Sequence, residues 1–394
     1  MRHGRTWAGE CLHDVTRLVD RRLQGRLPTG VDRVNLEYVR HFGDRARALI
    51  RWRGLWVALS GHDSGRLFDA LQAPGAGFRA LVYRSVAKAL PHSALRGVPR
   101  GAVLFNVGHS GLDQPGYGAR VEQFGLRAVF FLHDLIPTTY PEYARVGEAA
   151  RHERRLQTML AFGRGVVVNS NHTLQALDAY GRARGVSVPP CEVAPLATVR
   201  LPPPAAKAPF DAPYFVMLGT IEPRKNHLLL LHVWRELART LGSNAPRLVI
   251  IGQRGWEYEQ VAGLLERCEA LRGLVIENHR CRDTELSNYL HRARALLFPS
   301  FVEGYGLPLV EALACDTPVI ASDLPVFREI AGDIPDYLHP LDGSGWRQAV
   351  LDYAQTSSPR RAAQLVRLQG FIAPTWEVHF ARVDAFLCRL GLMS

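Results

Sequence analysis

Short apolar runs alternate with stretches of helical periodicity along most of the chain, and this alternation limits the folds that the chain can adopt. Runs rich in β-branched and aromatic residues are typical of buried strands, and a helix between two such strands lets them pair in parallel. The sequence therefore predicts the α/β class, with doubly wound parallel sheets and crossover helices. The expected strands are 55–59, 102–107, 127–132, 165–168, 214–218, 247–251, 274–277, 295–298 and 318–321, with one more near 14–19.

A proline-rich segment separates two series of such runs. Five prolines fall within residues 199–213, and proline can neither continue a helix nor occupy a central strand. We therefore expect an N-terminal Rossmann-like domain at 1–200, a semi-rigid linker at 201–212, a second Rossmann-like domain at 213–372 and a C-terminal helix at 373–394. Ligands of such sheets bind beyond the carboxyl ends of the strands, so a cleft between the two domains is expected.

The composition is that of a globular protein with an excess of positive charge. Among 394 residues, 47% are hydrophobic and 22% charged, which excludes a disordered or collagen-like chain. The formal net charge is +11, which favours anionic partners such as acidic lipid headgroups, phosphorylated substrates or nucleic acid. Nucleic acid is the weakest of these interpretations, because no dense run of basic residues is present.

The sequence also indicates the cellular compartment of the protein. None of the six cysteines forms a CxxC pair, and no His/Cys cluster has the spacing of a zinc site. The N-terminal residues lack the apolar core of a signal peptide, and no apolar run approaches the ~20 residues that span a bilayer. We expect a reduced, cytoplasmic protein, either soluble or peripheral at the cytoplasmic face of the inner membrane.

The segment 296–323 carries the densest set of candidate binding residues. After a strand, a loop with two glycines leads to Pro308, which suits the first turn of a helix. Backbone N–H groups at such a helix start attract anions. Glu303 precedes this helix and Glu311 lies about one turn inside it, where carboxylates can accept hydrogen bonds from sugar hydroxyls. The alternative is an ordinary helix entry with two solvated glutamates.

A second candidate phosphate site lies at residues 215–231. A strand ends at Gly219, and Arg224, Lys225 and Asn226 open the next helix. Cations are unfavourable at a helix N-terminus, which already carries positive partial charge, so this pair predicts a bound anion. Two solvated side chains on a loop are the alternative.

Three further places in the first half carry weaker signals. His133 and Asp134 directly follow an apolar strand, and His109 follows another. Residues 28–33 form a predicted glycine turn with Gly30 and Arg33, placed after the strand expected near 14–19. Each of these could equally be a structural feature.

Taken together, these segments resemble the retaining glycosyltransferases of family four (group 1), which have the GT-B fold. The most specific element is the Glu-x7-Glu motif of Glu303 and Glu311 in PSFVEGYGLPLVEALA. The stretch GTIEPRKNH, the loop at 252–256 and the closing Trp376–Phe380 are also similar. The early TGVDRV and the HDLIP stretch resemble the mannosyltransferase and rhamnosyltransferase branch of bacterial surface-polysaccharide assembly.

The resemblance implies a role for each matching residue. Arg224 and Lys225 would clamp the donor diphosphate, Glu303 would contact the transferred sugar, and Glu311 would bind the ribose. His133 would help to stabilise the transition state beside the donor sugar. The remaining donor-binding residues implied are Gly30, Gly219, Gly252, Arg254, Gly304, Tyr305, Gly306 and Leu307, and the weaker acceptor-side residues are Arg33, His109 and Asp134.

The family also implies a mechanism without cofactor or metal. Retention of the anomeric configuration would follow from front-face attack by the acceptor hydroxyl, and the cations would take the place of a metal ion. The C-terminal helix would cross back to the first domain. One departure from the family pattern is the turn Cys315–Asp316, where many relatives have glycine; Asp316 can adopt the left-handed conformation required there.

The substrates are the least constrained part of the interpretation. The resemblance favours a GDP-sugar donor carrying mannose or a deoxyhexose, with a UDP-sugar as the alternative, and a glycan or lipid-linked acceptor. The basic charge adds peripheral contact with an anionic membrane. A non-catalytic protein that binds sugar nucleotides or polysaccharide on the same scaffold is the competing hypothesis.

Overall fold

The computed structural model describes residue 7 and residues 9–73, 75–198 and 201–394, which divide into two compact units. The first unit comprises residues 1–196 and 376–394, and the second comprises 197–375. Residues 199 and 200, at the start of the proline-rich segment, lie outside the described residues, as do residues 1–6. In the described part of the chain, no helix is long and apolar enough to cross a membrane.

The first unit is built on a seven-stranded sheet. All neighbouring strands pair in parallel except the edge pair β2–β3, which is antiparallel. The strand order across the sheet is β3 (Leu55–Ala58), β2 (Arg47–Trp52), β1 (Cys11–Asp14), β4 (Val103–Asn106), β5 (Arg127–Leu132), β6 (Gly163–Val168) and β7 (Cys191–Val193). Because the chain adds strands to one side of β1 and then to the other, the order reverses between β1 and β4.

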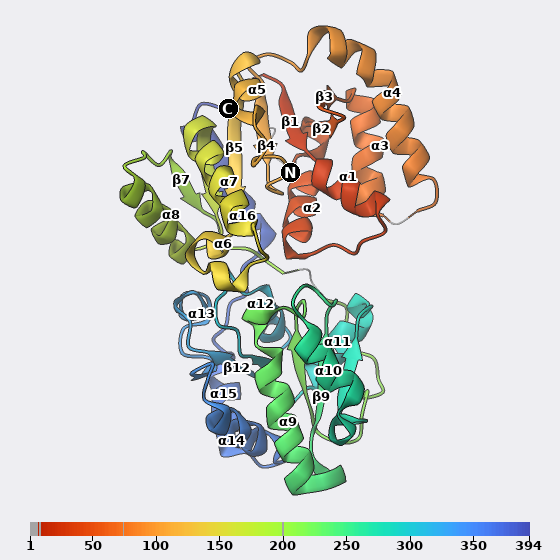
Figure 1. Cartoon of the computed structure of the whole chain (residues 1–394), viewed down its shortest axis with the longest axis vertical. Coiled ribbons are helices and arrows are strands. Elements are labelled where there is room, and N and C mark those ends of the chain that lie inside the picture. The colour runs from red at the N-terminus through yellow and green to blue at the C-terminus, as the bar shows by residue number, and fades with distance from the viewer. Residues whose placement is uncertain (1–6, 8, 74, 199–200) are drawn as a thin grey trace. The chain divides into compact units, whose positions relative to one another are not determined.

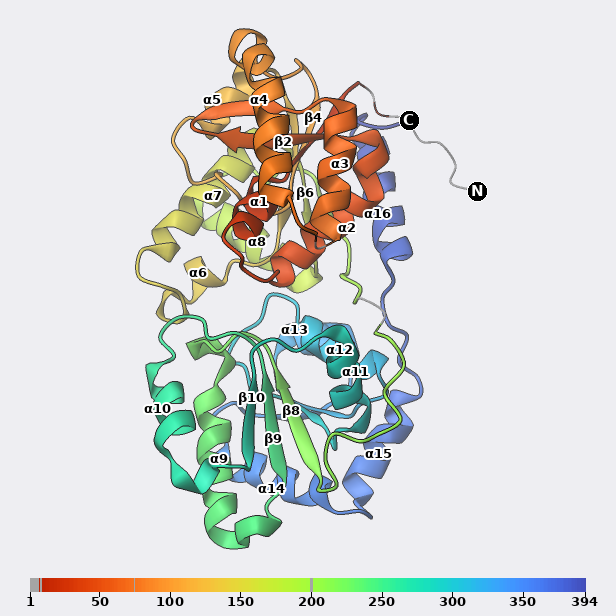
Figure 2. The same cartoon turned by 90° about the vertical axis from the view of Figure 1, so that its right-hand side faces the viewer.

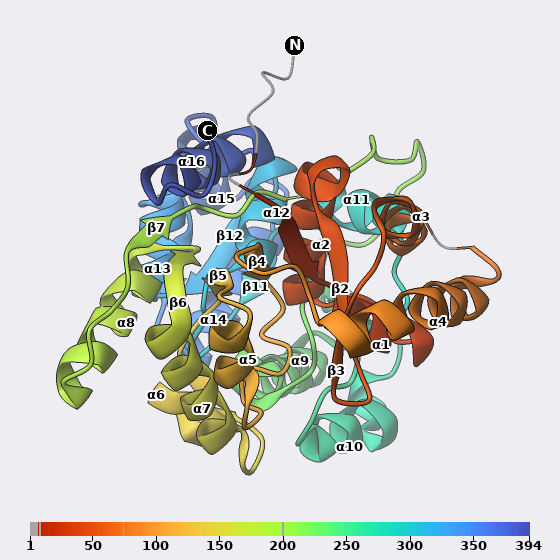
Figure 3. The same cartoon turned by 90° about the horizontal axis from the view of Figure 1, so that it is seen from above.

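Helices cover both faces of this sheet, as the α/β prediction requires. One face packs against α5, α7 and α8, and the other against α1 to α4 and α16 (Figures 1 and 3). The helices are α1 (Thr16–Leu23), α2 (Gly30–Phe42), α3 (Gly61–Gln72), α4 (Phe78–Arg96), α5 (Tyr117–Gln123), α6 (Ile136–Thr139), α7 (Glu148–Phe162), α8 (Asn171–Arg184) and α16 (Trp376–Arg389).

The C-terminal helix α16 is part of the first unit. His379 is fully buried; its Nδ1 lies 3.0 Å from the Pro195 carbonyl and its Nε2 lies 3.0 Å from the Tyr38 hydroxyl. The Phe380 ring stacks on His41 with centroids 4.0 Å apart. These contacts fasten α16 to α2 and to the segment that follows β7.

The second unit is a fully parallel six-stranded sheet. Its order is β10 (Val275–Asn278), β9 (Arg247–Ile251), β8 (Tyr214–Leu218), β11 (Leu296–Phe298), β12 (Val319–Ser322) and β13 (Asp336–Leu338), so the order reverses between β8 and β11. Figure 2 shows β8 to β10 between α9 and α10 on one side and α11 and α12 on the other. The helices are α9 (His227–Leu241), α10 (Glu259–Arg267), α11 (Asp283–Arg292), α12 (Leu307–Ala314), α13 (Pro325–Ala331), α14 (Gly343–Ala354) and α15 (Pro359–Leu368).

Strict alternation along β8 explains the two layers of this unit. Phe215 and Met217 point into the core formed with α9, α10 and α14, while Tyr214 and Val216 point into the core formed with α11, α12 and α13. Both sets are buried because a parallel sheet has helices on both faces.

The start of the chain differs from the prediction. The strand expected near 14–19 is helix α1, and the strand before it, β1, ends at Asp14. Gly30 therefore begins helix α2 and does not form a turn after a strand. The strands β1, β2, β7 and β13 were not predicted. Strand β1 lacks an apolar pattern because two of its four residues, His13 and Asp14, are polar, although both are almost completely buried.

The proline-rich segment packs against the second unit. No helix or strand forms over 201–213, and Arg292 of α11 donates hydrogen bonds to the carbonyls of Ala205 and Ala206 at 2.6 and 3.0 Å. The Phe210 ring lies 5.2 Å from that of Tyr214.

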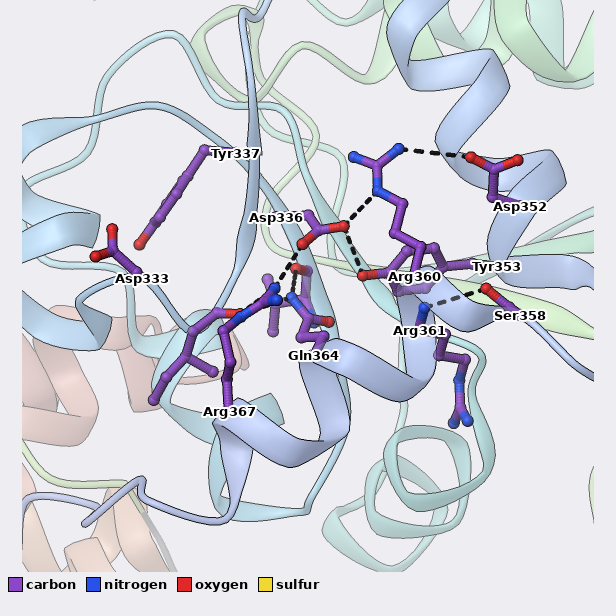
Figure 4. A network of polar contacts seen from close by, with 12 residues as sticks. Asp333, Asp336, Tyr337, Asp352, Tyr353, Ser358, Arg360, Arg361, Gln364 and Arg367 are labelled. Atoms are coloured by element: carbon purple, nitrogen blue, oxygen red, sulfur yellow. Dashed lines mark hydrogen bonds and ion pairs between the residues drawn. The ribbon is translucent and has the colours of Figure 1, made fainter.

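Buried polar side chains fasten α15 to the edge of this sheet (Figure 4). Gln364, which is fully buried, accepts from the Val319 N–H at 2.9 Å and donates to the Val319 and Ile334 carbonyls at 2.6 and 3.0 Å. Beside it, the Asp336 carboxylate accepts from Arg360 and Arg367 at 2.5 and 2.6 Å. These contacts hold α15 against the start of β12 and against the segment that leads into β13.

The Gln364→Leu variant should therefore be markedly less stable than the wild type. The substitution leaves the N–H and the carbonyl of Val319 without these partners, and each unpaired buried polar group costs about 1–3 kcal/mol. We expect the melting temperature in a thermal unfolding experiment to fall by about 5 °C or more. The control is Gln348→Leu, which removes an exposed amide on α14 that bonds only Asp352. An equal loss in both variants would contradict the role given to Gln364.

Candidate functional site

The candidate site of the second unit lies where the strand order of its sheet reverses. β8 and β11 are neighbours, and the loops that follow their carboxyl ends are 219–226 and 299–306. Successive helices leave such a pair of strands toward opposite faces, and the loops between them form the usual ligand site of an open α/β sheet. The sequence segments around Arg224 and around Glu303 therefore meet at one edge of one sheet.

Glu303 connects the two loops through a set of short ion pairs. Lys225 Nζ lies 2.5 Å from Glu303 Oε1, and Arg224 Nη1 lies 2.7 Å from Glu303 Oε2. The Ser300 hydroxyl donates to Oε1 at 2.7 Å. Both oxygens of this carboxylate are therefore occupied by donors.

The charges of this cluster are buried together. Lys225 and Glu303 are each 6% exposed, which excludes the interpretation of solvated loop side chains. Burial raises the pKa of the Glu303 carboxyl, but the charges of Arg224 and Lys225 and the hydrogen bonds from Lys225 and Ser300 lower it further, to about 2. Burial lowers the pKa of Lys225, and the Glu303 charge opposes that effect. At neutral pH Glu303 is an anion that accepts hydrogen bonds and has no proton to give.

The anion that the paired cations require is supplied in part by the protein itself. Arg224 Nε lies 2.5 Å from Glu222 Oε1, so two carboxylates, Glu222 and Glu303, face the two cations. The cations therefore do not by themselves demand a phosphate. Glu222 was not identified from the sequence, although it stands two residues before Arg224 in the same motif.

The backbone of this loop is shaped by the residues at its ends. Pro223–Lys225 form a single 3-10 turn, and Asn226 follows with φ of +59° before α9 begins. The Asn226 amide donates to the Pro299 and Pro340 carbonyls at 3.2 and 2.8 Å. The cations thus precede the helix by one turn, on a loop held from two sides.

The second loop ends at the N-terminus of α12. Gly306 has φ of +109°, and a Cβ there would lie 2.7 Å from the Phe327 ring, so only glycine fits. Leu307 and Pro308 begin the helix as predicted. Glu311 is 7% exposed, against the expectation for a solvated glutamate, and Gly304 and the buried Tyr305 complete the loop. At the far end of α12, Asp316 has φ of +54°, which confirms the conformation expected for that turn.

Gly219 and Gly252 follow β8 and β9 and lie against each other. A Cβ on Gly252 would be 1.9 Å from the Gly219 carbonyl oxygen, so the close contact of these two loops requires glycine. Arg254 lies just beyond and contacts two carboxylates, with Nη2 2.9 Å from Glu277 Oε2 and Nη1 2.5 Å from Glu266 Oε1.

The candidate histidines of the first unit, buried His133 and half-buried His109, form a cluster at the ends of β4 and β5. His133 Nε2 lies 2.8 Å from the Val107 carbonyl, and His109 Nε2 lies 2.7 Å from the Phe131 carbonyl. The two rings have centroids 5.1 Å apart, and a third ring, His152, lies 6.0 Å from His109. Asp134 accepts from the N–H of Ile136 at 3.0 Å and so starts α6.

Burial keeps these imidazoles neutral. It lowers the pKa of His133 to about 4, and it lowers that of His109 well below the ordinary value, with the neighbouring His133 and His152 adding to the effect. Each ring of the pair is therefore one donor and one acceptor at pH 7.

The start of α2 carries a polar cluster that the sequence did not reveal. Asp32 is almost fully buried and accepts from Arg17 Nε at 2.7 Å, and Arg21 Nε lies 2.8 Å from its other oxygen. Asp32 also completes a capping box with Thr29, a signal that the spacing of the two residues does contain. Arg33 lies in the first turn of the same helix.

Residues 204–334 match the family described as Glycosyl transferases group 1. The serotype-specific mannosyltransferase WbdA of Escherichia coli is 31% identical over 261 residues, which are 60% of this chain and 31% of WbdA. The O-antigen chain mannosyltransferase B of Escherichia coli is 32% identical over 164 residues, which are 42% of each chain. The match to this family model therefore lies within the second unit. The chain as a whole spans less than half the length of these two relatives.

The likeness to solved structures extends over both units. Anabaena Alr3699/HepE in complex with UDP-glucose has a TM-score of 0.64 over 97% of this chain and 98% of that one, at 12% identity. The fold of the chain is therefore GT-B, as predicted. In the described residues, no group of three or more His, Cys, Asp or Glu side chains is arranged to hold a metal ion.

The buried histidines predict a loss of stability in acid. In the unfolded chain histidine titrates near pH 6.5, so between that pH and the folded pKa of about 4 the unfolded state binds more protons. The contribution of His133 is therefore complete above pH 6.5 and is lost as the pH falls toward 4. Between pH 7.5 and 5.0, we expect this residue alone to account for about 2 kcal/mol of the fall in unfolding free energy.

The measurement is urea unfolding of the wild type and of His133→Asn at the two pH values. The variant should lose less stability on acidification than the wild type, while His62→Asn, at an exposed position on α3, should not change the difference. An unchanged pH dependence in His133→Asn would show that His133 is not held neutral.

Proposed function

We propose that the chain is a retaining glycosyltransferase that moves a hexose from a nucleotide-sugar donor to a glycan or lipid-linked acceptor. The observation that carries the proposal is the buried cluster of Arg224, Lys225 and Glu303 at the reversal point of a sheet that belongs to the group 1 transferases. Its relatives WbdA and mannosyltransferase B support mannose as the transferred sugar and surface-polysaccharide assembly as the setting.

The chemistry that the cluster offers is neutralisation of the leaving group. When the bond from the sugar to the diphosphate breaks, negative charge develops on the phosphate oxygen. An ammonium has three N–H donors, of which the structure places one on Glu303, so Lys225 can hold Glu303 and a phosphate together. Fixed cations in a dry site act on developing charge without the cost of reorganising solvent.

Glu303 then has an orienting role. Its oxygens are bound by Lys225, Ser300 and Arg224, and it stays ionised at neutral pH. Such a carboxylate does not donate a proton to the leaving group, and it can still accept a hydrogen bond from a sugar hydroxyl. The acceptor hydroxyl would attack from the side of the departing diphosphate, which takes the proton, so that the anomeric configuration is kept. No metal is required.

We assign the remaining donor contacts to the same edge of the second unit. Glu311 would bind the ribose, and the backbone of Gly304 to Leu307 would bind phosphate at the start of α12. Gly219, Gly252 and Arg254 would line the nucleoside side. From the first unit, His133 and Gly30 would contact the donor. Arg33, Asp134 and His109 would contact the acceptor.

The double variant Arg224→Ala/Lys225→Ala should lose transferase activity. If the cations act on charge that develops in the transition state, the transfer rate should fall by about 100-fold or more. The measurement is transfer from a radiolabelled nucleotide sugar to a mannose oligosaccharide without added metal. Arg235→Ala/Arg239→Ala removes two exposed cations from α9 of the same unit and should leave the rate unchanged. Unaltered turnover in the first variant would refute the assignment.

We propose a GDP-sugar as the donor, because the relatives are named mannosyltransferases. The thermal unfolding temperature should rise with GDP, by the equivalent of about 2.7 kcal/mol at 100 times the dissociation constant, and not with UDP, ADP or dTDP. A rise with UDP instead would keep the transferase and overturn the choice of donor. Binding of GDP without any transfer activity would favour a non-catalytic binding protein.

A further inference from the structure

The net positive charge of the chain comes entirely from the first unit. Residues 1–196 and 376–394 contain 29 Lys and Arg against 18 Asp and Glu, whereas residues 197–375 contain 19 of each. The net charge of +11 is therefore a property of one unit, and a general bias of composition toward arginine does not explain it. The neutral unit is the one that carries the group 1 transferase sequence.

Within the first unit, the excess is concentrated around α4. No Asp or Glu occurs from residue 70 to residue 112, while Arg79, Arg84, Lys88, Arg96 and Arg100 all fall in this stretch. Four of these five cations lie on α4, a 19-residue helix. Figures 1 and 3 show α4 at the periphery of the first unit, beside the edge strand β3.

The outward side of α4 mixes cations with exposed apolar side chains. Its inward side carries Val82 and Val86, which pack on the sheet. At 3.6 residues per turn, Arg84, Lys88 and Leu95 fall on the opposite side and Tyr83 on the flank between the two. Tyr83 and Leu95 are 48% and 86% exposed. The small side chains of the same side are Ala80, Ala87 and Ala94.

The adjoining hairpin of β2 and β3 extends this surface. Its turn carries exposed Arg53, and the ring of Trp52 meets that of Tyr83 edge to face with centroids 5.3 Å apart. We call the side chains of Arg53, Tyr83, Arg84, Lys88 and Leu95 the α4 surface.

The cations of α4 differ in their partners from those of α1 and β2, which pair with buried carboxylates. Arg17 and Arg21 pair with Asp32, and Arg51 pairs with Asp14. In the described residues, the one ion pair formed by an α4 cation joins Lys88 to Asp63 at 3.6 Å, with Lys88 65% exposed. Removing cations from this helix therefore costs little folding energy, and an external anion can neutralise them.

We propose that the α4 surface binds the face of an anionic lipid bilayer. Each Lys or Arg held near such a face attracts acidic headgroups, and aromatic and aliphatic side chains beside the cations enter the headgroup boundary. Duplex nucleic acid would supply phosphates for Arg84 and Lys88 but no apolar phase for Leu95. The α4 surface shares no residue with the site proposed in the second unit, so the membrane proposal does not depend on the proposed reaction.

The test is co-sedimentation of the full chain with vesicles in the absence of nucleotide. Vesicles of phosphatidylcholine with 30% phosphatidylglycerol should bind the protein, vesicles of pure phosphatidylcholine should not, and 0.5 M NaCl should release it. In Arg84→Gln/Lys88→Gln the partition coefficient should fall about thirty-fold, which corresponds to about 1 kcal/mol for each charge. Tyr83→Ser/Leu95→Ser should weaken binding while preserving its dependence on salt.

The matched control is Arg164→Gln/Arg182→Gln. These exposed arginines lie on β6 and α8, near the opposite edge of the same sheet, and their removal changes the net charge by the same amount. Binding should stay within about twofold of the wild type. Equal losses of vesicle binding in the two charge variants would show that only net charge matters. Strong salt-dependent binding to duplex DNA without binding to vesicles would assign the surface to nucleic acid. Either result overturns the proposal. The GDP-dependent melting shift, measured on the same samples, tests the nucleotide site separately.

Discussion

The ion pair between Lys225 and Glu303 determines how the candidate site is organised. It joins the loops that follow two neighbouring parallel strands, β8 and β11, at the point where the strand order of the sheet reverses. A buried pair of this kind is costly unless its remaining polar positions are satisfied, and here Ser300, Arg224 and Glu222 take part in the same network. The loops are therefore fixed in place before any substrate arrives, which is what preorganised electrostatic catalysis requires.

The two units divide the electrostatic work. The second unit is neutral overall, and the two cations of its candidate site, Arg224 and Lys225, are paired with carboxylates. The first unit carries the whole net charge, and its α4 surface presents cations that face solvent. The net charge of the whole chain does not reveal this difference. The local arrangement of charges decides which anion a surface attracts.

The sequence was informative where local signals and tertiary contacts agree. Strand β8 is apolar throughout and β9 is apolar after Arg247, and the helix entry at Pro308 follows from the properties of proline, so all three were predicted correctly. Strand β1 was not predicted because its polar residues are buried with partners far away in the sequence. His13 forms a hydrogen bond with Asn35, and Asp14 forms an ion pair with Arg51. For the same reason, the pairing of Arg224 with Glu222 and Glu303 could not be foreseen from a motif that suggested only an external anion.

The return of α16 to the first unit has a consequence for synthesis of the chain on the ribosome. The second unit is one continuous segment, so it can fold as soon as residue 375 has emerged. The first unit needs residues 376–394 as well, and until they appear Tyr38 and His41 lack the ring contacts that they make with His379 and Phe380. The unit whose translation begins first is therefore completed last. During translation of residues 197–375, the side chains that α16 will cover are open to aggregation.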